Sequence, residues 1–395
     1  MNSISNHIKY VLFFTYILGC LSFFDPTFFD ITPKALRYIQ TISFVFLYIF
    51  LIKNKIKITP YFKGFFLIGV GMLFSIGTAS TMHEGQSFTE SFFAMLPRFL
   101  SYMLFFILLK LQPNIRFTEQ IIFFIGLTSA LVVIQIWILY PNILFGSFVD
   151  SSIRGTRMTA NGDTFKICFM FYSLNMLLLK NSSKKYVFFF IICAISVILG
   201  IVRQVIVITT ALCLMFCFFH ISIKKWAFLL IIVTIGFISI SKMDFYQRLV
   251  ELTEIERHED RGGENIRITA TRYYINEAQE NLITRIFGNG VPTEQSAYAK
   301  KVVQNESKTL CFGSDVGLAY FYHLYGILAI LGLISLTWAT WKIKIPFRFL
   351  YLKYCFAYIL LASIASGPII YVNECIALPF ICYMLGKINK EEKIV

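Results

Sequence analysis

The sequence predicts an all-α, polytopic membrane protein with about twelve transmembrane helices and one large external loop between the ninth and tenth. Composition is the first observation behind this prediction. Of the 395 residues, 57% are hydrophobic and 15% are charged, whereas soluble domains average roughly 45–50% and about 25%. So few charges cannot cover a surface that faces water. A cytosolic enzyme, a disordered chain and a secreted disulfide scaffold are therefore excluded.

The second observation is a series of apolar runs, since a helix needs about 20 mostly apolar residues to cross a bilayer. The first run ends in Phe-Phe-Asp-Pro rather than at a small-residue cleavage site, so it is counted as a helix. The long run from Tyr186 to Phe219 spans twice only if it turns near Gly200–Arg203. The predicted spans are 9–24, 36–52, 62–79, 97–111, 119–140, 163–179, 186–202, 204–221, 226–241, 314–341, 348–366 and 368–386.

The third observation is the placement of Lys and Arg, which orients the spans. Every second connection carries at least two basic residues, and the loops between them, such as 81–90, carry acids. Both termini are then cytoplasmic, and the net charge of +14 requires no nucleic acid, because it favours anionic lipid headgroups. The basic connections are Lys53–Lys57, Lys110–Arg116, Lys180–Lys185, Lys224–Lys225, Lys342–Arg348 and the tail after Lys387.

The chain thus divides into spans one to nine (1–241), a long loop (242–313) and spans ten to twelve with a cytoplasmic tail (314–395). The loop lies outside by parity and holds eleven of the 22 acidic residues. Connections longer than about 15 residues without structure are usually functional or disordered. The loop mixes helical periodicity with Gly, so we expect a small folded cap of helices.

Metal and nucleotide chemistry is not visible in the sequence. The nine cysteines lie mainly inside apolar runs, and none occurs in a pattern typical of a metal site. Neither a phosphate-binding G-x-x-x-x-G-K-[ST] motif nor an H-E-x-x-H motif is present. We therefore predict no metal and no cofactor.

Arginines in predicted external segments are the first candidates for a binding site. We expect a helix that begins after Thr269 and ends at Gly288, with Arg272 in its first turn and Arg267 just upstream. Planar guanidinium groups beside a helix N-terminus suit a phosphate or pyrophosphate. The alternative is a solvated face on which these arginines pair with neighbouring acids.

Three further arginines stand near predicted span ends. Arg154 and Arg157 flank a glycine in an outer loop, and Asn161 or Asp163 is expected to cap the next helix. An anionic lipid headgroup is the alternative partner for both arginines. Arg203 lies between two apolar runs, where a charge is expensive unless it faces a cavity or reaches the interface. Arg98, at the start of the fourth predicted span, has the same two interpretations.

Asp315 and His323 begin the tenth predicted span. Asp315 is placed to act as a base, a cap or an acceptor for a sugar hydroxyl. His323 lies a little over two turns deeper, where a single histidine more often joins two helices by a hydrogen bond. Tyr273 and Tyr274 offer aromatic faces for sugars, and Glu374 is expected at the outer surface.

In layout and in three short segments, the chain resembles the O-antigen polymerase and O-antigen ligase superfamily of bacterial envelope glycosyltransferases. The segments are Gly200 with Arg203, the stretch from Arg272 to Gly288-Asn289-Gly290, and Asp315 and Gly317 followed by Tyr325-Gly326-Ile327. The resemblance implies a fold of the GT-C type in the bacterial inner (plasma) membrane. It also implies a donor saccharide carried on polyprenyl (undecaprenyl) pyrophosphate and a reaction on the outer face without metal or nucleotide.

By the same resemblance, Arg154, Arg157, Arg203, Arg267 and Arg272 hold the pyrophosphate, and a chain-length regulator protein is a further partner. Ligases usually offer His followed by Asn where this chain has Asp315, which favours a polymerase of O-antigen, capsule or exopolysaccharide over a ligase that transfers glycan to lipid A core. The competing class is a lipid-linked oligosaccharide flippase. A transporter predicts two similar halves and charges near mid-bilayer, and we find no such repeat.

Overall fold

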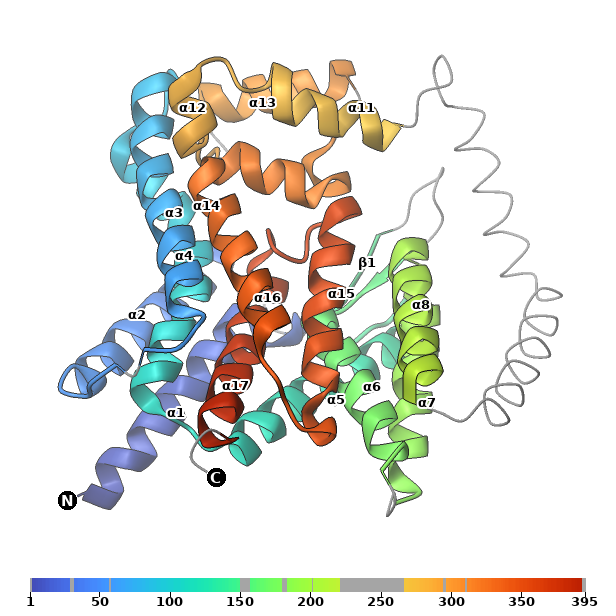
Figure 1. Cartoon of the computed structure of the whole chain (residues 1–395). Helices are drawn as coiled ribbons and strands as arrows, with labels where there is room; N and C mark the ends of the chain where they lie inside the picture. The colour runs from blue at the N-terminus through green and yellow to red at the C-terminus, as the bar shows by residue number, and fades with distance from the viewer. Residues whose placement is uncertain are drawn as a thin grey trace, which may run out of the picture.

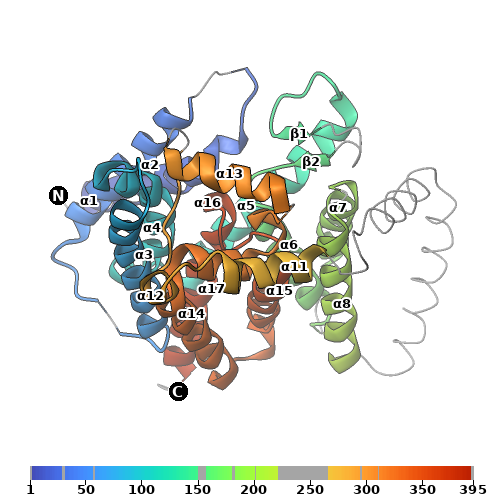
Figure 2. The same cartoon turned by 90° about the horizontal axis from the view of Figure 1, so that it is seen from above.

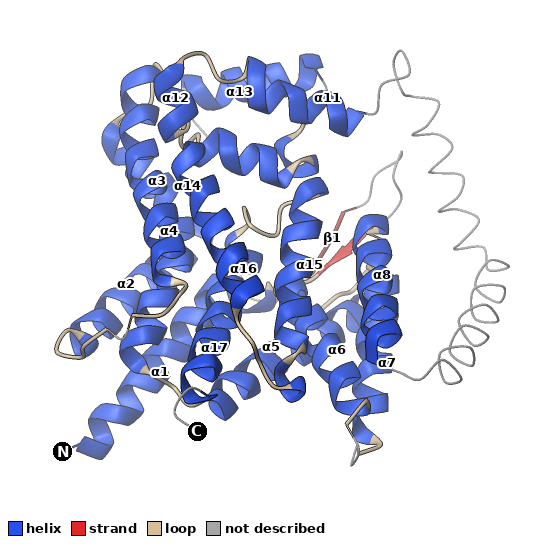
Figure 3. Ribbon diagram, viewed as in Figure 1, coloured by secondary structure: helices blue, strands red, loops and turns tan. Residues whose placement is uncertain are grey.

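The computed structural model describes residues 2–28, 32–56, 58–149, 157–179, 183–200, 202–220, 266–293, 296–309 and 311–392. Within these ranges the chain is helical apart from one small hairpin (Figures 1 and 3). The first elements are α1 (Asn2–Cys20), η1 (Ser22–Phe24), α2 (Pro33–Leu51), α3 (Phe62–Met82), α4 (Phe88–Leu111), α5 (Ile115–Leu139), β1 (Ser147–Val149), β2 (Arg157–Thr159), α6 (Asp163–Leu177), α7 (Lys185–Leu199) and α8 (Arg203–His220).

The chain is next described from residue 266 onward, in two parts. The cap consists of α11 (Ile266–Arg272), the π-helical turn η3 (Tyr273–Glu277), α12 (Leu282–Phe287) and α13 (Ala297–Thr309). The remaining elements are η4 (Gly313–Asp315), α14 (Gly317–Lys342), η5 (Phe347–Phe349), α15 (Tyr351–Ala365), α16 (Val372–Cys375) and α17 (Ala377–Glu392).

The chain is a multi-pass membrane protein, as its composition predicts. Among the described residues, six helical stretches are long and apolar enough to cross a bilayer: α3, α4, α5, α8, α14 and the stretch that contains α15. Shorter apolar helices lie within α1, α2 and α7. Each predicted span overlaps a helix except 226–241, which lies outside the described residues. The predicted turn between α7 and α8 is confirmed, whereas the total of twelve spans stays a prediction.

The cap and the chain termini occupy opposite ends of the helical bundle. In Figure 1 the cap helices lie across the top, and the N and C labels lie at the bottom. Figure 2, seen from above, shows the cap over the middle of the molecule, with α1 and α2 on one side and α7 and α8 on the other. Residues 266–309, apart from 294 and 295, thus contain the helices of the cap, and its external location stays a prediction.

Basic connections meet at the end where the termini lie. Asn54, between α2 and α3, donates a hydrogen bond to the carbonyl of Lys110 (3.0 Å). The Lys387 amine of α17 donates to the carbonyl of Pro113 (2.7 Å). Three of the basic segments, at 53–57, at 110–116 and in the tail, thus meet at one end of the bundle, as the charge pattern predicts.

Helices α3 and α14 pack closely because glycines line their contact. Gly64 of α3 lies against Gly332 and Leu336 of α14, where a Cβ on Gly64 would overlap the leucine side chain. Gly71 of α3 faces the backbone of Tyr325 in the same way. Inside a bilayer, close approach through small residues is a main source of helix association. The candidate site is built where these two helices meet the cap.

The fourth span begins well before residue 97, where the sequence placed it. Ser87 and Glu90 form a capping box at the start of α4, in which the Ser87 Oγ accepts from the Glu90 amide (3.3 Å) and the Glu90 carboxylate accepts from the Ser87 amide (2.7 Å). Arg98 consequently lies inside α4 and not at its start. Its Nε donates to the carbonyl of Ile370 (3.2 Å).

The last predicted span, 368–386, is also wrong at its start. The segment between α15 and α16 is not helical and is buried within the bundle, with Ile369 and Ile370 nearly inaccessible. The Tyr102 hydroxyl donates to the carbonyl of Ile369 (2.6 Å). Non-helical backbone inside a membrane protein is tolerated where other protein groups satisfy its polar atoms, and α4 supplies those groups here.

Glu374, expected at the outer surface, instead caps α6. Its carboxylate accepts from the backbone amides of Asp163 (3.0 Å) and Thr164 (2.6 Å), and from the Thr164 hydroxyl. The predicted caps were Asn161 or Asp163. Asn161 donates instead to the carbonyl of Leu21 (3.0 Å). The free N–H groups at a helix start favour a carboxylate, and this one comes from the opposite end of the sequence.

Candidate functional site

The candidate site lies where the cap meets α3 and α14. The segment Gly288–Gly290 follows α12, and its last two amides donate to the carbonyls of His323 (2.8 Å) and Leu324 (2.9 Å). Helix α14 is interrupted at Gly326, which has φ 71°, so these two carbonyls are free to accept from the cap. In Figure 1 the first part of α14 runs crosswise beneath the cap and the rest runs down through the bundle.

Two glycines let this segment pass between the helices. Gly288 has φ 79°, and a Cβ there would overlap the carbonyl of Leu324. Gly290 has φ 73°, and a Cβ there would overlap the carbonyl of Ser75. Thr78 of α3 donates to the carbonyl of Gly288 (2.5 Å). Glycine is required at both positions because a side chain would fit neither the backbone conformation nor the space.

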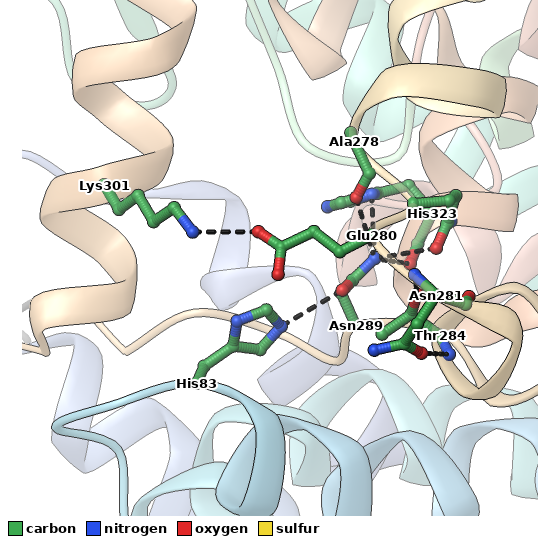
Figure 4. Close-up of polar contacts among 9 residues, drawn as sticks. His83, Ala278, Glu280, Asn281, Thr284, Asn289, Lys301 and His323 are labelled. Atoms are coloured by element: carbon green, nitrogen blue, oxygen red, sulfur yellow. Dashed lines mark hydrogen bonds and ion pairs between the residues drawn. The ribbon is translucent and has the colours of Figure 1, made fainter.

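Asn289, between these glycines, joins two histidines from different elements (Figure 4). Its Oδ1 lies 3.1 Å from Nε2 of His83, and its Nδ2 lies 3.1 Å from Nδ1 of His323. The same Nδ2 donates to Oε1 of Gln279 (3.0 Å). Asn289 is 1% exposed, so its carboxamide is held by protein partners in place of water.

The His83 ring is held from a second direction. It stacks on the ring of Tyr298 in α13 with a centroid distance of 3.8 Å and an interplanar angle of 3°. Burial lowers the pKa of His83 from its usual 6.5, although the hydrogen bond to Asn289 and the nearby Glu280 carboxylate oppose this shift. His83 is therefore a neutral imidazole at neutral pH.

A cavity of about 80 Å³ opens beside the two histidines. One wall carries an ion pair in which the Lys301 amine donates to the Glu280 carboxylate (2.8 Å), and this contact lowers the pKa of Glu280. Three tyrosines also line the cavity. Its lining residues are His83, Tyr273, Tyr274, Glu277, Ala278, Glu280, Asn289, Tyr298, Lys301, Val302, Asn305, Glu306 and His323.

An open depression of about 630 Å³ adjoins the cavity on the connection between α3 and α4. It is lined by residues 80–87 and Glu90. Gln86, 4% exposed, ties this connection to the cap, because it donates to the carbonyl of Val291 (2.8 Å) and accepts from the amide of Thr293 (3.0 Å). His83 lines both the depression and the cavity.

The two predicted catalytic residues occupy different surroundings. His323 is 5% exposed, lies in the crosswise part of α14 and lines the cavity. Asp315 belongs to η4 at the start of α14, is half-buried, and does not occur among the described residues that line the cavity. The structure thus brings His323, but not Asp315, to the cavity beneath the cap.

The two predicted sugar-stacking tyrosines also differ. Tyr274 is 2% exposed, and its hydroxyl donates to Glu306 (2.7 Å) and to the carbonyl of Cys311 (3.0 Å). Its ring packs edge-on against those of Tyr273 and Tyr320, so it forms part of the cap's small core. Tyr273 is only half-buried and reaches the cavity.

The structure describes the side chains of only three of the five predicted arginines. Arg154 lies outside the described residues, and so does the side chain of Arg157 at the start of β2. Arg203 is the first residue of α8, next to the turn that joins α7 and α8. Arg267 and Arg272 are exposed on α11.

Arg272 is not in the first turn of a helix, as the sequence predicted. Helix α11 (Ile266–Arg272) continues directly into the π-helical turn η3 (Tyr273–Glu277), so Arg272 lies inside a helical stretch, in the last turn of α11. The predicted single helix breaks because η3 ends at Glu277 and Asn281 caps a new helix, α12, through the Thr284 amide (2.9 Å). Only the end of α12 at Gly288 follows the prediction. Free amides of a helix start therefore do not contribute to anion binding beside Arg272.

Sequence reasoning missed His83, Gln86 and the bridge through Asn289. The acid-rich connection around His83 carried no recognisable motif, and the G-N-G signal drew attention to its glycines. No protein-family model matches this chain, and no curated protein is significantly similar to it.

Proposed function

We propose that this protein is a membrane glycosyltransferase of the polysaccharide polymerase type. It extends saccharides carried on polyprenyl pyrophosphate, and it acts at the end of the bundle covered by the cap. The observation that carries this proposal is the group of His83, Asn289 and His323 where the cap meets the bundle, beside an open depression and a polar cavity. Three basic segments, at 53–57, at 110–116 and in the tail, lie at the opposite end, which supports an outer location for the cap.

The chemistry required of such a site is modest, because the donor is already activated. The protein must orient an acceptor hydroxyl, accept its proton and stabilise negative charge on the departing pyrophosphate. Neutral imidazole can accept the proton. The exposed arginines Arg267 and Arg272, with Arg203, are the proposed contacts for the pyrophosphate, because guanidinium groups pair with phosphate oxygens in a bidentate manner.

Deletion of the gene, followed by electrophoresis of the cell's glycans, tests this function. A polymerase predicts that a ladder of chain lengths collapses to single repeat units and that the wild-type gene restores it. Intact long chains that accumulate on the lipid carrier would identify a ligase instead. Repeat units retained on the cytoplasmic face would identify a transporter, and an unchanged glycan profile would contradict all three.

Substitution of Arg272 tests the proposed pyrophosphate contact. We expect Arg272→Ala and Arg272→Lys both to shorten the ladder. A lysine ammonium group carries the same charge but cannot form the paired hydrogen bonds that a planar guanidinium makes with phosphate oxygens. Arg116→Ala is the matched control, since Arg116 is exposed on α5 at the opposite end of the bundle. A normal ladder with normal membrane abundance in Arg272→Ala would remove this residue from the site.

A further inference from the structure

His83 is the residue that connects the two hollows at the cap junction. It lines the open depression on the α3–α4 connection, and it lines the smaller cavity beneath the cap. A volume of about 630 Å³ is within the usual range for small-molecule sites, roughly 300–1,000 Å³. The cavity of about 80 Å³ has room for only a few water-sized groups, each about 30 Å³. The depression is therefore large enough for a small-molecule ligand, whereas the cavity holds only a few water-sized groups.

The hydrogen bond to Asn289 selects one tautomer of His83. The Asn289 Nδ2 donates to Gln279, so the Oδ1 is the acceptor that faces His83 Nε2 (3.1 Å). His83 therefore carries its proton on Nε2, and Nδ1 retains its lone pair. In Figure 4 this second ring nitrogen points away from Asn289, toward the side where Glu280 and Lys301 lie. Such fixation of one nitrogen by a hydrogen bond is the usual way in which proteins orient a basic imidazole.

The groups that face His83 determine whether its imidazole is protonated. They are the carboxylate of Glu280 before α12, the Lys301 amine and Tyr298 of α13, and His323 of α14. Glu280 and Lys301 are paired and more than half exposed, so this side of the ring is open to water. Burial holds the pKa of His83 below its usual value. The imidazole can therefore accept a proton at neutral pH.

We propose that His83, positioned by Asn289, is the base that takes the proton of the acceptor sugar's hydroxyl group. This inference rests on the proposed transferase function and extends it. The hydroxyl oxygen attacks the anomeric carbon of the donor, and the bond from that carbon to the pyrophosphate oxygen breaks. The polyprenyl pyrophosphate leaves with the electron pair, and the hydroxyl proton moves to Nδ1 of His83 and then to water.

Two other candidate bases are less well placed. His323 uses Nδ1 for the contact with Asn289 and is 5% exposed. Asp315 does not line the cavity, as judged from the part of the chain that the structure describes. His83 differs from both because it is oriented and also lines the open depression.

Chemical modification tests the accessibility and protonation state of His83 without any assay of activity. Diethyl pyrocarbonate reacts with neutral imidazole, and peptide mass spectrometry identifies each modified histidine. In the full-length protein in native membranes, we expect His83 to react with a half-maximal rate below pH 6.5, while the buried His323 stays protected; exposed His7 is the control for reagent access. Absence of reaction at His83, or reaction at His323 in its place, would overturn the assignment of the accessible base.

Activity then tests the catalytic step, with glycan elongation on the lipid carrier as the measured rate. We expect His83→Ala to lower the rate by about 10²-fold, within the range for general bases, while His7→Gln leaves it unchanged. Glu280→Gln removes a charge that raises the pKa of His83, so the acid limb of the pH profile should move to lower pH. Lys301→Gln should move it to higher pH.

A purely structural role for His83 predicts equal losses at every pH and no opposite shifts in the two charge variants. That result would overturn the proposal. A wild-type protein without elongation activity would instead overturn the proposed function, and the modification experiment would still decide whether His83 is the accessible, neutral imidazole.

Discussion

Substitution of Gly288 by alanine should detach the cap from the bundle. Gly288 has φ 79° and ψ 170° and lies against the carbonyl of Leu324. An L-residue in this glycine-only region is strained by about 1–3 kcal/mol. The overlap of the new Cβ with backbone adds about 1–3 kcal/mol, as in other overpacked sites. Together they amount to roughly 2–6 kcal/mol, a large share of the ~5–15 kcal/mol that stabilises a typical protein.

Thiol labelling measures this effect, because eight of the nine cysteines are buried. Cys311 lies beneath the cap at 1% exposure, and burial raises its pKa, so it should react slowly while the cap is docked. In detergent-solubilised protein we expect Gly288→Ala to label Cys311 faster and to unfold at a lower temperature. Gly77→Ala in α3 is the matched control: its Cβ would meet no atom within 4 Å. Wild-type labelling and melting in Gly288→Ala would refute this account of the junction.

Three further predictions concern stability and orientation. Glu374→Ala removes a carboxylate that accepts from two amides of α6 and should lower the free energy of unfolding by about 2–4 kcal/mol. In thermal melts Glu374→Gln should lose less stability than Glu374→Ala, and equal losses would exclude a capping role. Because the folded-state pKa of His83 lies below 6.5, the unfolded chain binds more protons as pH falls below that value. Wild-type stability should therefore decrease from pH 6.5 down to the lower folded-state pKa, and melts of His83→Gln should show a weaker dependence. A reporter active only outside the cytoplasm should be active when fused after Ser307 in the cap and inactive after Asn54; the opposite pattern would invert the orientation.

Span positions and the cap could be predicted from the sequence because each depends on local composition. The apolar runs mark the helices, and three of the basic segments meet at one end of the bundle, as the contacts of Lys110 and Lys387 show. The start of α4 was missed because a capping box, Ser87 with Glu90, extends the helix beyond the strongly apolar residues. The nonhelical segment before α16 reads as an ordinary apolar run, since burial in protein and burial in lipid favour the same side chains.

The candidate site was harder to predict, because long-range contacts determine it. His323 was singled out as a candidate base at the start of the tenth predicted span, but nothing local in the sequence connects it with His83. The two are joined through Asn289, whose position depends on Gly288 and Gly290 fitting between α3 and α14. Glu374 likewise acts on a helix start more than 200 residues away. Periodicity carries no information on such pairs.

The most direct test of the central claim is elongation by the purified protein in liposomes that contain an oligosaccharide linked to polyprenyl pyrophosphate. The account predicts chains of increasing length and one free polyprenyl pyrophosphate for each new linkage, with no nucleotide sugar and no divalent metal added. An unchanged lipid-linked donor, in a preparation that melts cooperatively and binds the liposomes, would contradict it.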